Sequence, residues 1–207
     1  MIRASGRCGL LGIALAVMLA LTAPMSAIAN DTAKAVIEGF YQRLLEVMNK
    51  GPELGFEGRR AVLAPVLDET FDLPFLAKLV LGRVRKDLSP EQIDEFTRVF
   101  TAMVVATYAS RFDNYEQERF AATGERGLKR GRVLVETQVE GTSMGTVRIN
   151  YMMHQRDGAW RIINVISQGV SDISLKRAEY QSVIRKHGFD GLLNRIETQT
   201  AKMVREG

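Results

Sequence analysis

The side chains that most often carry out chemistry are few in this sequence. Its only histidines are His154 and His187, and its only cysteine is Cys8. His154 falls on the polar side of an alternating segment, which indicates a surface histidine. His187 comes directly before a glycine at the expected end of a helix, where a positive charge interacts favourably with the helix dipole. Neither histidine stands in the spacing that zinc ligands usually show.

The carboxylates and hydroxyl groups of the sequence give no sign of a catalytic site either. Asp113 and Glu116 form a possible carboxylate pair, but no base lies near them in the sequence. The segment from Gly141 to Gly145 joins two alternating segments as a hairpin, so no Gly-x-Ser-x-Gly elbow leads from a strand into a helix. No glycine-rich phosphate loop precedes a helix. We therefore expect no catalytic residue, no metal and no cofactor, and the protein is predicted not to be an enzyme.

The charge of the chain is close to balanced. It has 28 basic and 24 acidic residues, a formal net charge of +4. Residues 1–29 contain two arginines and no acidic residue, so the rest of the chain carries about +2. Nucleic-acid binding has little support at this charge. Four basic residues surround a predicted hairpin connection, where they form a solvated turn or meet anionic headgroups or an acidic partner: Arg126, Lys129, Arg130 and Arg132.

The N-terminal segment has the pattern of a secretory signal peptide. Two arginines precede an uncharged run from Gly9 to Thr22, Pro24 then breaks the run, and Ala27-Ile28-Ala29 supplies small residues for cleavage. The alternative is a retained anchor, but the run is shorter than the ~20 residues that span a bilayer. We expect a signal peptide over 1–29 and one domain over 30–207, which then lacks cysteine.

The elements that follow change from helices to strands and back to helices. Spacing of about 3.6 residues predicts helices over 32–48, 60–67, 73–81 and 89–112, with Gly51-Pro52 ending the first. Alternation predicts strands over 131–140, 146–154 and 160–166, preceded by a weaker one over 119–123. Helices return over 172–186 and 190–204. This order predicts an α+β domain, with an antiparallel curved sheet of three to four strands covered on one face by helices.

Flexible apolar side chains are plentiful, and two interpretations of them remain open. Methionine and phenylalanine recur along the chain, including Phe96, Phe100, Met103, Met152 and Met153. They suit a well-packed core, and they also suit a surface that adapts to irregular apolar ligands. A half-covered sheet facing a long helix is a geometry that can open between its layers.

Three segments of the chain resemble the MlaC family of periplasmic lipid-binding proteins of Gram-negative bacteria. They are Leu73–Gly82, then Ser89-Pro90-Glu91-Gln92, and above all Gln168–Ser171, which continues through Arg177–Tyr180 to Gly188–Leu192. The resemblance extends over the whole chain after the leader and includes Trp160. Gly51–Phe56 and Ala106–Phe112 are most similar to the branch associated with hopanoid biosynthesis. Asn164 departs from the family, because many relatives have an acidic residue there.

The resemblance implies a cystatin-like, nuclear-transport-factor-like fold and the function of a periplasmic carrier. Relatives hold the tails of a phospholipid between sheet and helices. They shuttle it between an inner-membrane ABC transporter with an MCE-domain ring and an outer-membrane lipoprotein–porin complex. A phospholipid or a hopanoid-type lipid is therefore the expected cargo. The alternatives are a lipid-independent interaction module with a filled core, or an isomerase on the same fold that uses a buried carboxylate with Tyr108 or Tyr151.

The face and period of each element predict which residues would line such a pocket, whose existence only the resemblance implies. The sheet wall is expected to consist of Val133, Val135, Ile149, Tyr151 and Met153. The helical wall is expected to consist of Phe40, Leu44, Leu76, Leu79, Phe100, Met103 and Tyr108.

Overall fold

The computed structural model describes residues 32–142 and 145–207. The predicted signal peptide over 1–29 lies outside the described residues, and its cleavage stays a prediction. Within the described part of the chain, no helix combines the length and the hydropathy needed to cross a membrane.

Helices α1 and α4 begin at the residues that the capping signals predict, whereas the helix predicted over 60–67 begins earlier, at Gly51. Thr32 accepts a hydrogen bond from the backbone of Ala35 at the start of α1. Ser89 and Gln92 form a complete capping box at the start of α4. The helices are α1 (Ala33–Asn49), α2 (Gly51–Thr70), α3 (Leu73–Leu81), the 3-10 helix η1 (Val84–Lys86), α4 (Pro90–Arg111) and α5 (Asp172–Glu206).

Five antiparallel strands form one sheet in the order of the sequence. They are β1 (Arg119–Gly127), β2 (Val133–Thr142), β3 (Gly145–Arg156), β4 (Ala159–Ser167) and β5 (Val170–Ser171). Val135 on β2 lies opposite Tyr151 on β3. A bulge shifts the register of the outer strand β1 between Ala122 and Gly124. The predicted antiparallel sheet is confirmed; β1 is longer than expected, and the two-residue β5 was not predicted.

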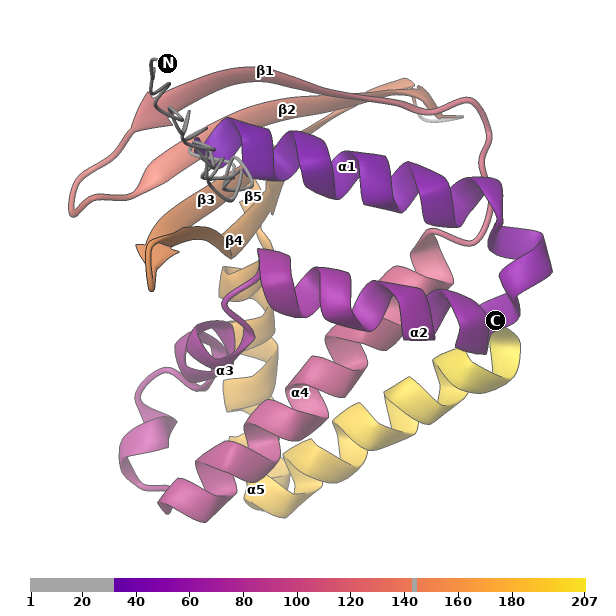
Figure 1. Cartoon of the computed structure of the whole chain (residues 1–207). Coiled ribbons are helices and arrows are strands. Elements are labelled where there is room, and N and C mark those ends of the chain that lie inside the picture. Colours follow the sequence, from indigo (N-terminus) through magenta and orange to yellow (C-terminus); the bar gives the residue numbers. More distant parts are fainter. Residues whose placement is uncertain (1–31, 143–144) are drawn as a thin grey trace, which may run out of the picture.

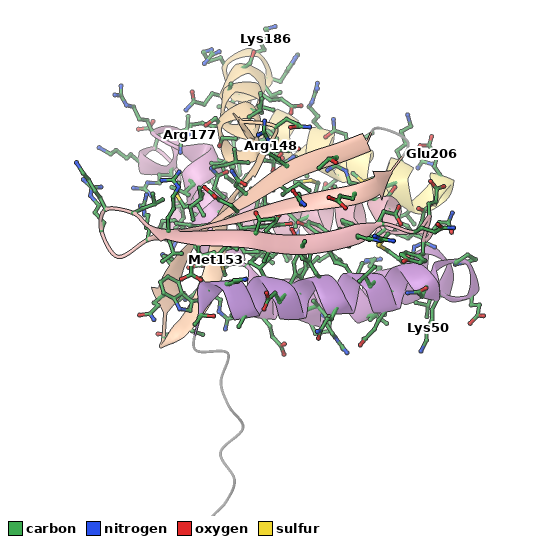
Figure 2. All side chains as sticks on the ribbon, turned by 90° about the horizontal axis from the view of Figure 1, so that it is seen from above. Lys50, Arg148, Met153, Arg177, Lys186 and Glu206 are labelled. Atoms are coloured by element: carbon green, nitrogen blue, oxygen red, sulfur yellow. The ribbon has the colours of Figure 1, made fainter. Side chains whose placement is uncertain are left out.

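All helices lie on one face of the curved sheet, as Figure 1 shows. The alternation predicted for β2 is confirmed, because Val135 and Val139 are buried beneath the helices whereas Glu136 and Gln138 are only half-buried. Polar side chains, with Arg148 labelled among them, predominate on the outer face in Figure 2. Leu134 of β2 is a buried apolar exception on this face. The α+β architecture with helices on one side of the sheet is thus confirmed.

Two glycines break helices from within. Gly51 and Pro52 begin α2 instead of only ending α1, and α2 kinks at Gly55, where φ is 60°. The predicted break after His187 is a kink inside α5 at Gly188, where φ is 74°. Only glycine adopts such backbone angles without strain. α5 therefore consists of two straight parts, the first beside the sheet and the second along α4 (Figure 1).

Candidate functional site

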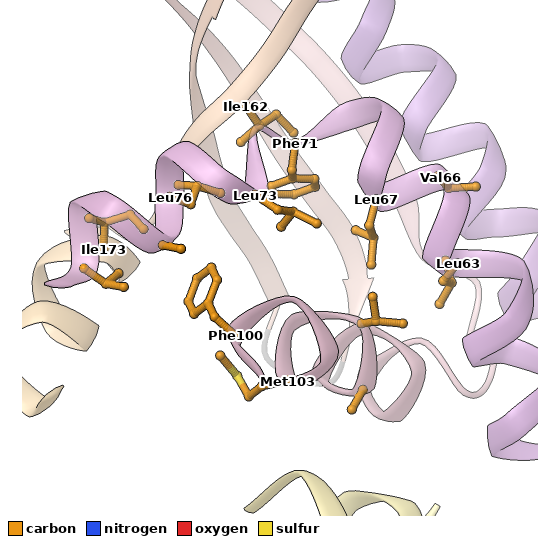
Figure 3. Close-up of a cluster of buried hydrophobic side chains, with 14 of the residues drawn as sticks. Leu63, Val66, Leu67, Phe71, Leu73, Leu76, Phe100, Met103, Ile162 and Ile173 are labelled. Carbon is orange, nitrogen blue, oxygen red and sulfur yellow. The ribbon is translucent and has the colours of Figure 1, made fainter. Parts of the chain in front are cut away.

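A cavity lies between the sheet and helices α3, α4 and α5. Its volume is about 200 Å³. Figure 3 shows Phe100 and Met103 pointing from α4 toward Leu76 on α3, with Phe71 and Ile162 on the same side of α4 as Leu76. The apolar wall consists of Phe71, Leu76, Phe100, Met103, Val104, Tyr108, Phe112, Ile149, Tyr151, Ile162, Val165 and Ile173.

The size of this cavity limits what it holds in the present conformation. An apolar cavity of about 150 Å³ accepts benzene, whereas pockets for drug-sized ligands measure about 300–1,000 Å³. At about 200 Å³, the cavity has room for part of one acyl chain. A complete lipid tail requires its walls to move apart, and the side chain of Met103 is of the adaptable kind that permits this.

Aromatic rings close the cavity on the side of α1. The ring of Phe40 packs against Phe71 at 5.7 Å and against Tyr108 at 5.9 Å between centroids. Phe71 and Tyr108 line the cavity, while Phe40 lines a separate groove between α1, α2 and the β3–β4 hairpin. Phe40 therefore forms a partition that separates the cavity from this groove.

The tyrosine hydroxyls in the cavity wall are uncharged. Desolvation, and next the nearby Tyr41, raise the pKa of Tyr151 well above the ordinary tyrosine value. Desolvation, and next the negative charge of Asp172, raise the pKa of Tyr108 in the same direction. Tyr41 shares a hydrogen bond of 2.6 Å with Thr137, whose hydroxyl donates to the Ile149 carbonyl. Among the described residues, no buried side-chain nitrogen or oxygen lacks a hydrogen-bond partner.

The mouth of the cavity is polar and carries a small positive charge. Arg111 from the end of α4 and Lys176 from α5 lie there with one acidic residue, the exposed Asp172. The Asn164 side-chain oxygen accepts a hydrogen bond of 3.1 Å from the Ser171 hydroxyl. The neutral amide at position 164 leaves the mouth with two cations and one anion, an arrangement that favours a group with a negative charge.

A buried carboxylate holds α3 against the sheet. Asp72 is 3% exposed and caps α3 by accepting a hydrogen bond from the Phe75 backbone at 3.1 Å. Its other partners are His154 at 2.8 Å and Arg156 at 2.7 Å, both on β3. The prediction of a surface histidine at 154 is wrong, since only 21% of that side chain is exposed and it pairs with Asp72. Sequence reasoning missed this contact because the partners are far apart in the chain.

The structure places half of the predicted pocket residues at the cavity. Leu76, Phe100, Met103, Tyr108, Ile149 and Tyr151 line it. Leu44, Val135 and Met153 are instead buried in the packed core, and Val133 is half-buried against that core. Phe40 forms the partition described above, and Leu79 lines a different groove. The periodicity identified the inward faces, but not how far along each element the cavity extends.

Several residues of the wall were not predicted. Ile162 and Val165 lie on β4, a segment that the sequence marks as apolar on both faces, and this was the signal available for them. Phe71 lies in the short break between α2 and α3, and Ile173 lies in the first turn of α5. No sequence pattern singled these two out. Within residues 32–142 and 145–207, no group of three or more His, Cys, Asp or Glu residues is placed to hold a metal ion.

Comparison with known proteins identifies relatives with the same fold. The family model described as MlaC protein matches residues 38–198. The intermembrane phospholipid transport system binding protein MlaC of Haemophilus influenzae is 21% identical over 138 residues, which is 64% of this chain and 64% of that protein. The toluene tolerance protein ttg2D of Pseudomonas putida is 21% identical over 174 residues, 81% of this chain and 80% of that protein.

One solved structure has the same architecture. The phospholipid-binding protein from Ralstonia solanacearum, determined in complex with a phospholipid, matches with a TM-score of 0.73 at 18% identity. The match covers 83% of this chain and 98% of that one. The structural match shows that this protein and the Ralstonia protein have the same fold. The family model spans most of the described residues. The chain therefore belongs to the MlaC family.

Proposed function

We propose that this protein is a periplasmic carrier that encloses the acyl tails of a phospholipid and transfers it between membranes. The observation that supports this most directly is the apolar cavity under the sheet with its polar, mildly cationic mouth. Tails fit the apolar wall, and the phosphate of a headgroup fits the mouth between Arg111 and Lys176. The MlaC relative is named for intermembrane phospholipid transport, and the Ralstonia relative was solved with a phospholipid.

The energetics of such a carrier require burial and no catalytic group. Each methylene that leaves water gains about 0.8 kcal/mol, so a long acyl chain gains roughly 10 kcal/mol or more on entering an apolar site. A carrier that crosses an aqueous compartment must therefore cover nearly all of the tail. The cavity covers part of a tail as it stands, and we propose that α3 moves away from α4 to admit the rest.

The remaining parts of the proposal concern export and partners. Residues 1–29 direct export to the periplasm and are removed after Ala29. The lipid is received from and delivered to an inner-membrane ABC transporter with an MCE-domain ring and an outer-membrane lipoprotein–porin complex. The mass of the intact exported protein tests cleavage directly, since the expected chain begins at Asn30. Membership of the hopanoid-associated branch, with a hopanoid-type cargo, stays a prediction.

The central experiment is to identify the cargo. The protein is purified from its own host without detergent, and its native mass is compared with its mass after organic extraction. We expect about one equivalent of phospholipid in the extract. An extract without any lipid contradicts a carrier and favours a lipid-independent interaction module; a different lipid class, such as a hopanoid, would identify another cargo.

A pair of variants on one strand tests whether the cavity holds the tail. Ile149 lines the cavity, and Val147 lies two residues away on the same face of β3, outside the lining. Ile149→Trp should fill the cavity and abolish lipid retention, measured by extraction and mass spectrometry. Val147→Trp should retain lipid at the level of the unchanged protein. Equal lipid content in both variants, with melting curves showing that both fold, would contradict this site.

A further inference from the structure

A third hollow lies next to the cavity, beside the C-terminal part of α3, and is strongly basic. It is a groove of about 500 Å³ between α3, η1 and α5. Its charged residues are Lys78, Arg83, Arg85, Lys86 and Arg177, and we call it the basic groove.

The positive charge of the basic groove is not balanced within the groove itself; Asp87 follows Lys86 directly but does not line it. Its lining contains no acidic residue. Among the described residues, the ion pairs of the molecule involve none of these five cations. Elsewhere several surface cations have a carboxylate partner, for example Arg43 with Glu46 and Arg60 with Glu57. Cations gathered in this way repel one another, and an anionic ligand relieves the repulsion.

A hydrogen bond and a close approach of two helices define the floor of the groove. The Arg177 Nε donates a hydrogen bond of 2.8 Å to the Leu79 carbonyl near the end of α3, which fixes the guanidinium there. Gly82 follows with φ of 59°, and a Cβ at this position would lie 2.9 Å from the side-chain nitrogen of Gln181. α3 and α5 therefore approach closely at this point, and the cations stand around a defined floor.

The basic groove and the cavity are both lined by residues of α3 and α5. Leu76 lines the cavity, and Leu79, about one turn further along the same side of α3, lines the groove. On α5, Lys176 lies at the mouth and the next residue, Arg177, lies in the groove. Figure 2 shows Arg177 next to α3 at the edge of the molecule. Any surface that binds the groove is thereby brought close to the mouth.

We propose that the basic groove and the adjoining turn of α5 dock the protein on the surface of an anionic phospholipid bilayer. The groove takes the phosphate groups. Clusters of lysine and arginine side chains attract the anionic headgroups of a bilayer. An acidic protein surface would also complement the cations, but the neighbouring cavity is lined by apolar residues that suit a phospholipid, which favours the bilayer. The proposal adds a docking surface to the proposed carrier function. It rests on that function in one respect, the interpretation of the mouth as the entrance for the lipid.

Vesicle sedimentation tests this proposal with two variants of equal charge. The exported protein is used after its mass has shown that residues 1–29 are absent, because an apolar leader would itself bind lipid. Vesicles of phosphatidylcholine with about 30% phosphatidylglycerol should bind it, and binding should weaken with salt. Arg83→Glu/Arg85→Glu should lower the affinity about tenfold or more. Lys129→Glu/Arg130→Glu, at the β1–β2 connection, should change it by less than about twofold.

The possible outcomes separate the two proposals. No vesicle binding by the unchanged protein, or equal loss in both variants, overturns membrane docking; the first result would leave an acidic protein as the partner of the groove. Cargo is measured in the same samples by lipid extraction. If the groove variant loses vesicle binding but keeps its lipid, docking is supported independently of cargo. If the protein binds vesicles through the groove but never contains lipid, the carrier function fails and docking stands.

Discussion

Two regions beneath the sheet have similar amino acids but different interiors. In the packed half, α1 and α2 lie against the sheet and α4, and side chains such as Leu44, Leu67 and Val135 are almost completely buried. In the hollow half, α3 and the start of α5 face β3 and β4 across the cavity. α3 has only nine residues and covers less of the sheet than the long helix α1. The difference shows that helix length and placement, more than residue type, decide where an apolar interior stays open.

The largest expected effect comes from truncating one leucine in each half, both visible in Figure 3. Leu67 is completely enclosed, so Leu67→Ala should lower the free energy of unfolding by about 4 kcal/mol. Leu76 already borders the cavity and loses fewer contacts, so Leu76→Ala should cost about half as much in delipidated protein. Urea denaturation measures both. Equal costs would contradict the distinction between a packed and a hollow half.

The anchor of α3 should give the next largest effect. Asp72→Ala removes a helix cap and the hydrogen bonds to His154 and Arg156. We expect a loss of about 3 kcal/mol, since caps contribute about 1 kcal/mol and bonds to charged groups about 1.5–3 kcal/mol. Hydrogen exchange should become faster in α3 before it does in α1. If α1 and α3 lost their protection from hydrogen exchange together, Asp72 would not anchor α3 separately from the rest of the fold.

High pH should destabilise the wall through its tyrosines. Their folded-state pKa values are raised, so the unfolded chain releases these protons first and stability falls as the pH increases above about 10. The loss is about 1.4 kcal/mol per pH unit for each tyrosine that keeps its proton in the folded state and releases it in the unfolded chain. Denaturation of Tyr108→Phe/Tyr151→Phe should depend less on pH over this range. An unchanged alkaline slope would show that these hydroxyls do not titrate on unfolding.

The smallest effect is expected at an exposed cap remote from both halves. Ser89→Ala removes the hydroxyl that caps α4, and Gln92 retains its bond to the backbone of residue 89. The expected cost is about 1 kcal/mol in denaturation experiments. Lipid content should not change, because α4 keeps its contacts at Phe100 and Met103. A loss of lipid in this variant would mean that the cavity depends on the whole of α4.

The sequence predicted the elements better than it predicted the cavity. Local signals such as the Ser89–Gln92 capping box and the alternation of β2 and β3 suffice for helices, strands and inward faces. The cavity depends on which elements lie opposite one another. Ile149 and Tyr151 therefore line it, whereas Met153, on the same face of β3, is buried in the packed core. The bridge of Phe71 to Ile162 arises only in three dimensions.

The bulge in β1 has a consequence for how the protein behaves at high concentration. β1 is an outer strand, and an outer strand offers unpaired backbone groups to any other strand that approaches. Here the register shifts at Ala122 and Gly124, and the exposed Arg119, Glu125 and Arg126 line the strand. Both features disfavour edge-to-edge pairing of two copies. A protein with an apolar interior open at one mouth is thereby protected from aggregation along its exposed strand.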